Sequence, residues 1–100
     1  MIRHIVFFNA RKREDVQRIA DELKGLGRIP HCSFFEVGLN RRVDRLSGAD
    51  VDVIVYAEFA DEAALEAYKA HPIYQDMITR VQPLRDMRIA ADFESTSASA

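Results

Sequence analysis

The most constraining feature of this sequence is an N-terminal segment that is apolar on both of its alternating faces. Residues 2–9 are rich in β-branched and aromatic side chains, and the segment is too short for a stand-alone helix, which predicts a strand. Its two faces consist of Ile2, His4, Val6 and Phe8 on one side and of Ile5 and Phe7 on the other. Such a strand needs cover on both faces of its sheet.

Strand and helix patterns alternate along the rest of the chain. Apolar residues at helical spacing predict a helix over 14–24, which we expect to end at Gly25 or Gly27. Period-two patterns predict strands over 31–39, 51–59 and 87–93. A further helical region begins after Asp61, breaks at His71-Pro72, restarts at Pro72 and stops at Pro83.

The resulting order, β-α-β-β-α(α)-β, predicts an α+β fold. With right-handed crossovers it is the ferredoxin-like split β-α-β topology, a four-stranded antiparallel sheet with helices on one face. The helices leave the second face bare over about 400 Å² in projection, close to the largest apolar patch usual on a monomer. We therefore expect a homodimer through the sheet face; the alternative is a monomer with an exposed apolar face.

Composition narrows the class of protein. One hundred residues predict one domain, which we place at 1–94, followed by a short low-complexity tail at 95–100. The net charge of −2 argues against nucleic-acid or polybasic membrane binding. The sequence contains one cysteine and no apolar run of membrane-spanning length, and it shows no signal-peptide pattern. We expect a soluble cytoplasmic protein.

Several segments of the chain resemble one known family, the stress-responsive A/B barrel (Dabb) domain of the dimeric α+β barrel superfamily. The matching segments are Arg3-His4-Ile5-Val6-Phe7-Phe8, Ile29-Pro30, Phe35-Glu36-Val37-Gly38, Glu58-Phe59 with Asp61, Tyr68-Lys69-Ala70-His71-Pro72-Ile73-Tyr74 and Ala91-Asp92-Phe93. The resemblance extends to Glu94, and its most specific part is the Tyr-x-x-His-Pro segment.

This resemblance implies a homodimer with a shared barrel and a small cavity between helices and sheet in each subunit. Some plant members of the family resemble polyketide cyclases and use a tyrosine and a histidine near that cavity, so the resemblance also implies cyclase chemistry. The usual family segment is Tyr-x-x-His-Pro-x-His. Tyr68, His71 and Pro72 match it, but Tyr74 stands where the last histidine would act as the base. His4 matches a histidine common on the first strand of the family.

The candidate catalytic or pocket residues are His4, Tyr68, His71 and Tyr74. An imidazole can act as a general base near neutral pH, and a tyrosine hydroxyl can polarise a carbonyl group. The alternative interpretation is structural: His71 caps the broken helix, Tyr68 packs in the core, and His4 hydrogen-bonds to the backbone.

Other chemistry has weaker support. We expect no metal and no cofactor, because no pair among His4, His31, Cys32 and His71 has the usual ligand spacing, and no glycine-rich phosphate loop is present. His31 and Cys32 are expected to be adjacent on a strand and to point to opposite faces, with Cys32 a small core residue rather than a nucleophile. A loop containing Arg41, Arg42 and Arg45 is either solvated or able to bind a phosphate or carboxylate.

Three hypotheses for function follow. The first is a Dabb-type stress-responsive homodimer that binds a small hydrophobic or aromatic molecule in a pocket between helices and sheet. The second is a cofactor-independent enzyme, a polyketide cyclase, isomerase or monooxygenase acting on a carbonyl or phenolic substrate. The third is an assembly module without a ligand. A cavity of roughly 300 Å³ or more with convergent polar groups would favour the first two.

Overall fold

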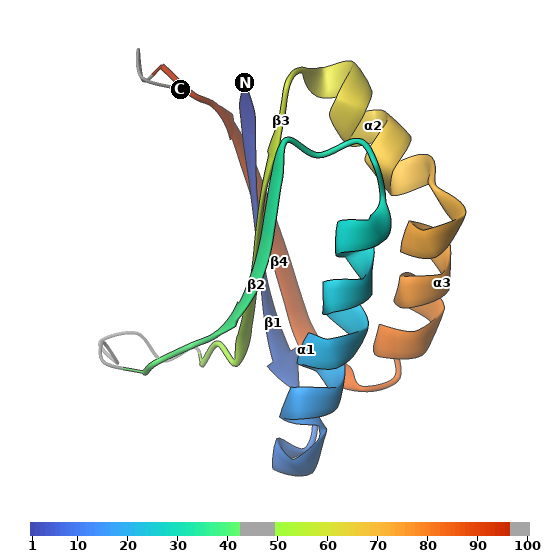
Figure 1. The fold of residues 1–100 in the computed structure, drawn as a ribbon. Coiled ribbons are helices and arrows are strands. Elements are labelled where there is room, and N and C mark those ends of the chain that lie inside the picture. Colours follow the sequence, from blue (N-terminus) through green and yellow to red (C-terminus); the bar gives the residue numbers. More distant parts are fainter. Residues whose placement is uncertain (43–49, 97–100) are drawn as a thin grey trace.

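Three helices lie against the same face of an antiparallel sheet, and their other side faces away from it (Figure 1). The computed structural model describes residues 1–42 and 50–96. The elements are β1 (Ile2–Ala10), α1 (Val16–Lys24), β2 (Phe34–Leu39), β3 (Val53–Phe59), α2 (Glu62–Ala70), α3 (Pro72–Val81) and β4 (Arg85–Glu94), with short 3₁₀ turns at Arg13–Asp15 and Gly25–Arg28.

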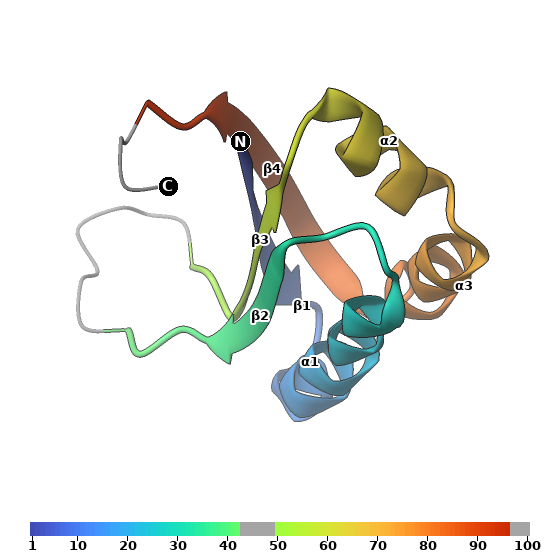
Figure 2. The same ribbon diagram turned by 45° about the horizontal axis from the view of Figure 1, so that its top comes forward.

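The four strands follow the order β2-β3-β1-β4, and every neighbouring pair is antiparallel. The first and last strands of the chain therefore lie side by side (Figure 2). This topology confirms the predicted ferredoxin-like arrangement. The ladder between β1 and β4 has one irregularity: Met87 pairs with Asn9, but the next partner, that of Ala10, is Arg85, so Asp86 is bulged out of the register.

Two predicted strands begin later than the sequence pattern indicates. The expectation that His31 and Cys32 are strand neighbours is wrong: they lie in a turn before β2, where the Cys32 thiol donates to the carbonyl oxygen of Ile29 over 3.6 Å. Val51 and Asp52 precede β3; the backbone N–H of Asp52 donates to the carbonyl oxygen of Phe8 (2.9 Å), one residue out of register with the β1–β3 ladder. The last strand is longer than predicted at both ends, and the first extends to Ala10.

The helix boundaries follow local capping chemistry. Helix α1 begins at Val16, two residues later than predicted, because a 3₁₀ turn occupies Arg13–Asp15. It ends at Lys24, and Gly25 is the residue that follows, as expected. Asp61 caps α2, its carboxylate accepting from the backbone N–H of Ala64 at 2.9 Å. The predicted break at Pro72 is confirmed, since α3 begins there.

The core lies between the helices and one face of the sheet. Its largest fully buried side chains include His4, Ile19, Leu23, Phe59 and Tyr68. The opposite face carries side chains that are partly exposed although apolar, with Phe7 at 37%, Phe34 at 47%, Ile89 at 53% and Phe93 at 51%. The prediction of a first strand that is apolar on both faces is confirmed, and one of those faces is left without helical cover.

Hydrogen bonds of one buried carboxylate link the end of β1 to the segment just before β3. The side chain of Asp52 is fully buried and accepts hydrogen bonds from Arg13, from Arg42 and from the backbone N–H of Ala10 (2.8 Å). The Arg13 hydrogen bond, aided by the Ala10 N–H and by the charge of Arg42, holds the pKa of Asp52 below its ordinary value although burial opposes the shift. This cluster orders the chain on both sides of the β2–β3 connection.

Some sequence predictions fall outside the described residues. These include Arg45 of the arginine loop, together with positions 97–100 of the predicted tail. The division at residue 94 stays a prediction, as does the cytoplasmic location. In the described ranges, no helix is long and apolar enough to cross a membrane.

Candidate functional site

His4 lies on the helix-facing side of β1 and is only 2% exposed. Its Nδ1 hydrogen-bonds to the carboxylate of Asp92, which is the residue directly opposite on β4. The expectation of a backbone partner for His4 is therefore wrong. The pairing of β1 with β4 places the carboxylate of Asp92 beside the imidazole ring, and this side chain is the partner. A carboxylate on Nδ1 fixes the orientation of an imidazole and leaves Nε2 as the nitrogen available for other contacts.

Tyr68 is packed in an aromatic cluster and is 1% exposed. Its ring centroid lies 4.9 Å from that of Phe59, 5.2 Å from that of Tyr74 and 6.1 Å from that of His4. Burial, with a smaller effect of Tyr74, raises the pKa of Tyr68 well above its ordinary value. The hydroxyl is therefore neutral at physiological pH, and the predicted packing of Tyr68 in the core is confirmed.

His71 serves as the N-cap of α3. Its Nδ1 accepts a hydrogen bond from the backbone N–H of Ile73 at 3.1 Å, so this nitrogen carries no proton. The ring contact of His71 is with His31, at a centroid distance of 6.2 Å, and not with the other three candidates. The structure thus brings His4, Tyr68 and Tyr74 together, and it confirms the predicted capping role of His71.

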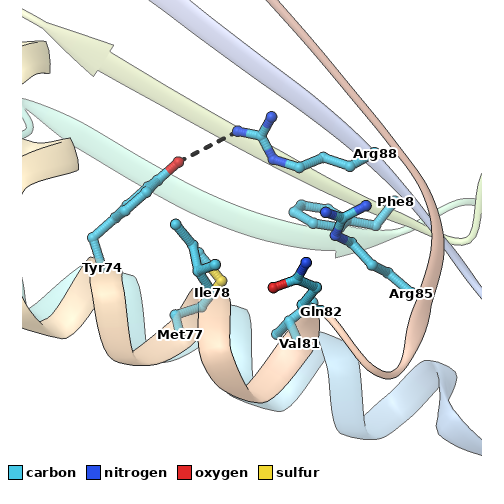
Figure 3. A pocket seen from close by; sticks show the side chains of 8 residues that line it. All are labelled: Phe8, Tyr74, Met77, Ile78, Val81, Gln82, Arg85 and Arg88. Carbon is cyan, nitrogen blue, oxygen red and sulfur yellow. Dashed lines mark hydrogen bonds between the residues drawn. The ribbon is translucent and has the colours of Figure 1, made fainter.

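A cavity of about 250 Å³ lies between α3 and the sheet (Figure 3). Its apolar lining consists of Phe8, Met77, Ile78 and Val81. Its polar lining consists of Tyr74, Gln82, Arg85 and Arg88. The hydroxyl of Tyr74 accepts a hydrogen bond from Nη2 of Arg88 at 3.3 Å, and this bond joins α3 to β4 across the cavity. Of the four predicted pocket residues, Tyr74 is the one that lines this space.

The two arginines of this cavity are the residues that sequence reasoning missed. Alternation along β4 indicates that Arg88 faces the helices, but it places Asp86, not Arg85, on the same side. The bulge at Asp86 reverses that assignment. Asp92 was also missed as a partner of His4, although pairing of the first and last strands in the predicted topology could have indicated it.

A second cavity, of about 550 Å³, lies at the other end of the molecule, where α2 meets the ends of β1 and β4. Its lining includes Ile2, Leu65 and Phe93 beside a group of acidic side chains. The acidic residues are Asp61, Glu62, Glu66, Asp92 and Glu94. The carboxylate that binds His4 therefore lies at the edge of this second space.

Metal binding, thiol chemistry and anion binding by the arginine loop gain little support from the described residues. Among the described residues, no three His, Cys, Asp or Glu side chains are grouped to hold a metal ion. Burial raises the pKa of the Cys32 thiol, which reduces its thiolate content and its nucleophilicity. Arg42 is paired with Asp50 and Asp52 of its own chain, whereas Arg41 is exposed.

A family profile described as the stress responsive A/B barrel domain (Dabb) matches residues 2–95. The chain belongs to the Dabb family. The match covers nearly the whole chain and agrees with the topology, and it confirms the resemblance read from the sequence. No curated protein shows significant sequence similarity to the chain.

Solved structures similar to this Dabb chain share its fold. A Dabb family protein with a ferredoxin-like fold from Mesorhizobium loti is 25% identical, with a TM-score of 0.77 over 96% of this chain and 97% of the other. A dimeric ferredoxin-like protein of unknown function from Thermobifida fusca is 25% identical, with a TM-score of 0.75 over 92% and 88%. A structure named as an antibiotic biosynthesis monooxygenase has a TM-score of 0.77 over 97% and 100%, but at 13% identity it shows the shared fold alone.

Proposed function

We propose that this Dabb protein is a homodimer in which each subunit binds a small hydrophobic or aromatic molecule in the cavity between α3 and the sheet. The observation that carries this proposal is the cavity of about 250 Å³ with an apolar lining and a few convergent polar groups. Its volume of about 250 Å³ is below the roughly 300 Å³ expected above for a ligand site, so the proposed ligand is smaller than a drug-sized molecule. An assembly module would be expected to fill this space with its own side chains.

The dimer part of the proposal is supported by the uncovered face of the sheet. Phe7, Phe34, Ile89 and Phe93 are all large, apolar and more than one-third exposed on that face. A second copy of the same face would remove them from water in a two-fold arrangement. Solved proteins of this fold, including the one from Thermobifida fusca, are described as dimeric.

A cofactor-independent enzyme is the second candidate, and the pair formed by His4 and Asp92 favours it. A histidine oriented by a carboxylate is a common general base. However, His4 and Tyr68 do not line either of the two cavities described above. Binding is therefore the better-supported function, because it needs only the residues that face the cavity.

Two tryptophan variants test whether the cavity binds a ligand. Ile78→Trp fills the space from α3, whereas Thr79→Trp puts the same side chain on the next, exposed residue, outside the cavity lining. The wild-type protein is screened by thermal shift with aromatic, phenolic and β-keto compounds. A ligand at a hundredfold excess over its dissociation constant adds about 2.7 kcal/mol to the free energy of unfolding.

We expect a rise in the melting temperature for the wild type and for Thr79→Trp, and no rise for Ile78→Trp. The natural sequence contains no tryptophan, so the introduced indole also reports by its fluorescence that each variant is folded. A flat response of the wild type across the panel would contradict the proposal. An undiminished shift in Ile78→Trp would place the ligand elsewhere and would contradict it too.

A further inference from the structure

The polar side of the α3 cavity is cationic, although the chain as a whole is slightly acidic. Arg85 and Arg88 line it, and no Asp or Glu does. The whole sequence carries a formal charge of −2, so this local excess of positive charge is not a general property of the surface. Figure 3 shows both guanidinium groups on the β4 side of the cavity, opposite the side chains of α3.

Both arginines of the cavity lack a carboxylate partner among the described residues, as some exposed arginines such as Arg18 also do, but these two line a cavity. Arg3, Arg13, Arg42 and Arg80 each form an ion pair with an Asp or Glu. Within residues 1–42 and 50–96, neither Arg85 nor Arg88 does, and the guanidinium of Arg88 donates a hydrogen bond to the hydroxyl of Tyr74. Two positive charges therefore adjoin one cavity without an acidic side chain to balance them.

The β-bulge in β4 creates this arrangement. In a regular strand, side chains two residues apart share a face, so Asp86 would be on the same face as Arg88. The register shift instead places Arg85 opposite Ala10, and Asp86 is not part of the cavity lining. Bulges often redirect a side chain next to a binding site. Because of this bulge, the guanidinium of Arg85 lines the cavity and the carboxylate of Asp86 does not.

We infer that the molecule bound in this cavity is an organic acid, a carboxylate attached to an apolar body about the size of one aromatic ring. Guanidinium groups bind carboxylates through charge-assisted hydrogen bonds, often two at a time. The body would contact Phe8, Met77 and Val81, which are buried and apolar. This inference rests on the proposed function, since it names the class of ligand for the same cavity.

The second cavity supplies a contrast within the same molecule. It has five acidic residues and a single lysine, Lys69, in its lining. A carboxylate ligand would be repelled there, although that space is the larger of the two. Charge, rather than volume, therefore selects the α3 cavity for an anion.

The test compares two probes of nearly the same shape, phenylacetate and the uncharged phenylacetamide, by isothermal titration calorimetry at neutral pH. The proteins are the wild type, Arg85→Gln, Arg88→Gln and the matched control Arg18→Gln. Arg18 is exposed on α1 and is not part of the cavity lining. Inorganic phosphate serves as a third probe, because it has the charge but not the apolar body.

We expect phenylacetate to bind the wild type and Arg18→Gln at least tenfold more tightly than phenylacetamide. In Arg85→Gln and Arg88→Gln this ratio should fall toward one, with the affinity for the amide unchanged. Equal binding of the two organic probes to the wild type would overturn the inference and leave the proposed function standing. Phosphate binding as tight as that of phenylacetate would also overturn the inference, while failure of every probe to bind would contradict both proposals.

Discussion

Asp52 shows how one residue outside any regular element can hold several elements in place. Its buried carboxylate is bonded to two arginines and to the backbone of β1. The pKa of this carboxyl is lowered in the folded state, mainly by the hydrogen bond from Arg13. The folded protein therefore binds the proton less well than the unfolded chain does, and the charged form stabilises the fold.

We predict that Asp52→Asn lowers the free energy of unfolding by about 2 kcal/mol at pH 7, the usual size of a hydrogen bond to a charged group. The stabilisation is present above the unfolded pKa of about 4 and is lost as the pH falls through the lower folded value. Urea unfolding between pH 7 and pH 2.5 measures it. Asp76→Asn, at an exposed position of α3, is the control. A wild-type advantage over Asp52→Asn that did not change with pH would contradict this role.

Single residues also mark the limit of sequence reasoning at the site. Tyr74 was predicted as a pocket residue and lines the cavity. Arg85 was not, because its direction depends on a bulge that the alternation of side chains does not reveal. The partner of His4 depends on the register between the first and last strands, which are 88 residues apart at His4 and Asp92. A bulge and a strand register depend on tertiary pairing, and the residues next to them in the sequence do not reveal either.

At the scale of elements, local chemistry determined most of what could be predicted. Asp61 and Pro72 fixed the starts of α2 and α3, because caps and prolines act within a few residues. The starts of β2 and β3 were misplaced, since the turn bond of the Cys32 thiol and the out-of-register bond of the Asp52 N–H have no signal in the alternation of side chains. Element order was therefore easier to predict than element boundaries.

The His71 cap leads to a prediction for α3. We expect His71→Ala to lower the free energy of unfolding by about 1 kcal/mol, because the backbone N–H of Ile73 loses its acceptor. His71→Asn should restore most of the loss, since asparagine is a good N-cap. Denaturant unfolding measures both. In each variant ligand affinity should stay within about twofold, because His71 does not line the α3 cavity. If His71→Asn kept its stability but lost binding, His71 would belong to the site.

At the scale of the whole molecule, the uncovered sheet face and the α3 cavity lie on opposite sides of the sheet. Ile89 is directly opposite Phe7 on the uncovered face, whereas Ile78 projects from α3 on the helical side. We predict that Ile89→Glu turns the dimer into a monomer, because a buried unpaired charge in the interface is costly. Ile78→Glu, the same substitution at an exposed isoleucine on the helical side, should remain dimeric.

Native mass spectrometry of the wild-type protein with phenylacetate tests dimerisation and cavity binding together, because one spectrum gives both the subunit number and the number of bound molecules. We predict a dimer that carries two bound molecules, with Ile89→Glu appearing as a monomer that carries one. A wild-type monomer would contradict dimerisation through the sheet face. A dimer that stays unliganded at saturating concentrations of phenylacetate and of phenylacetamide would contradict the cavity as a binding site.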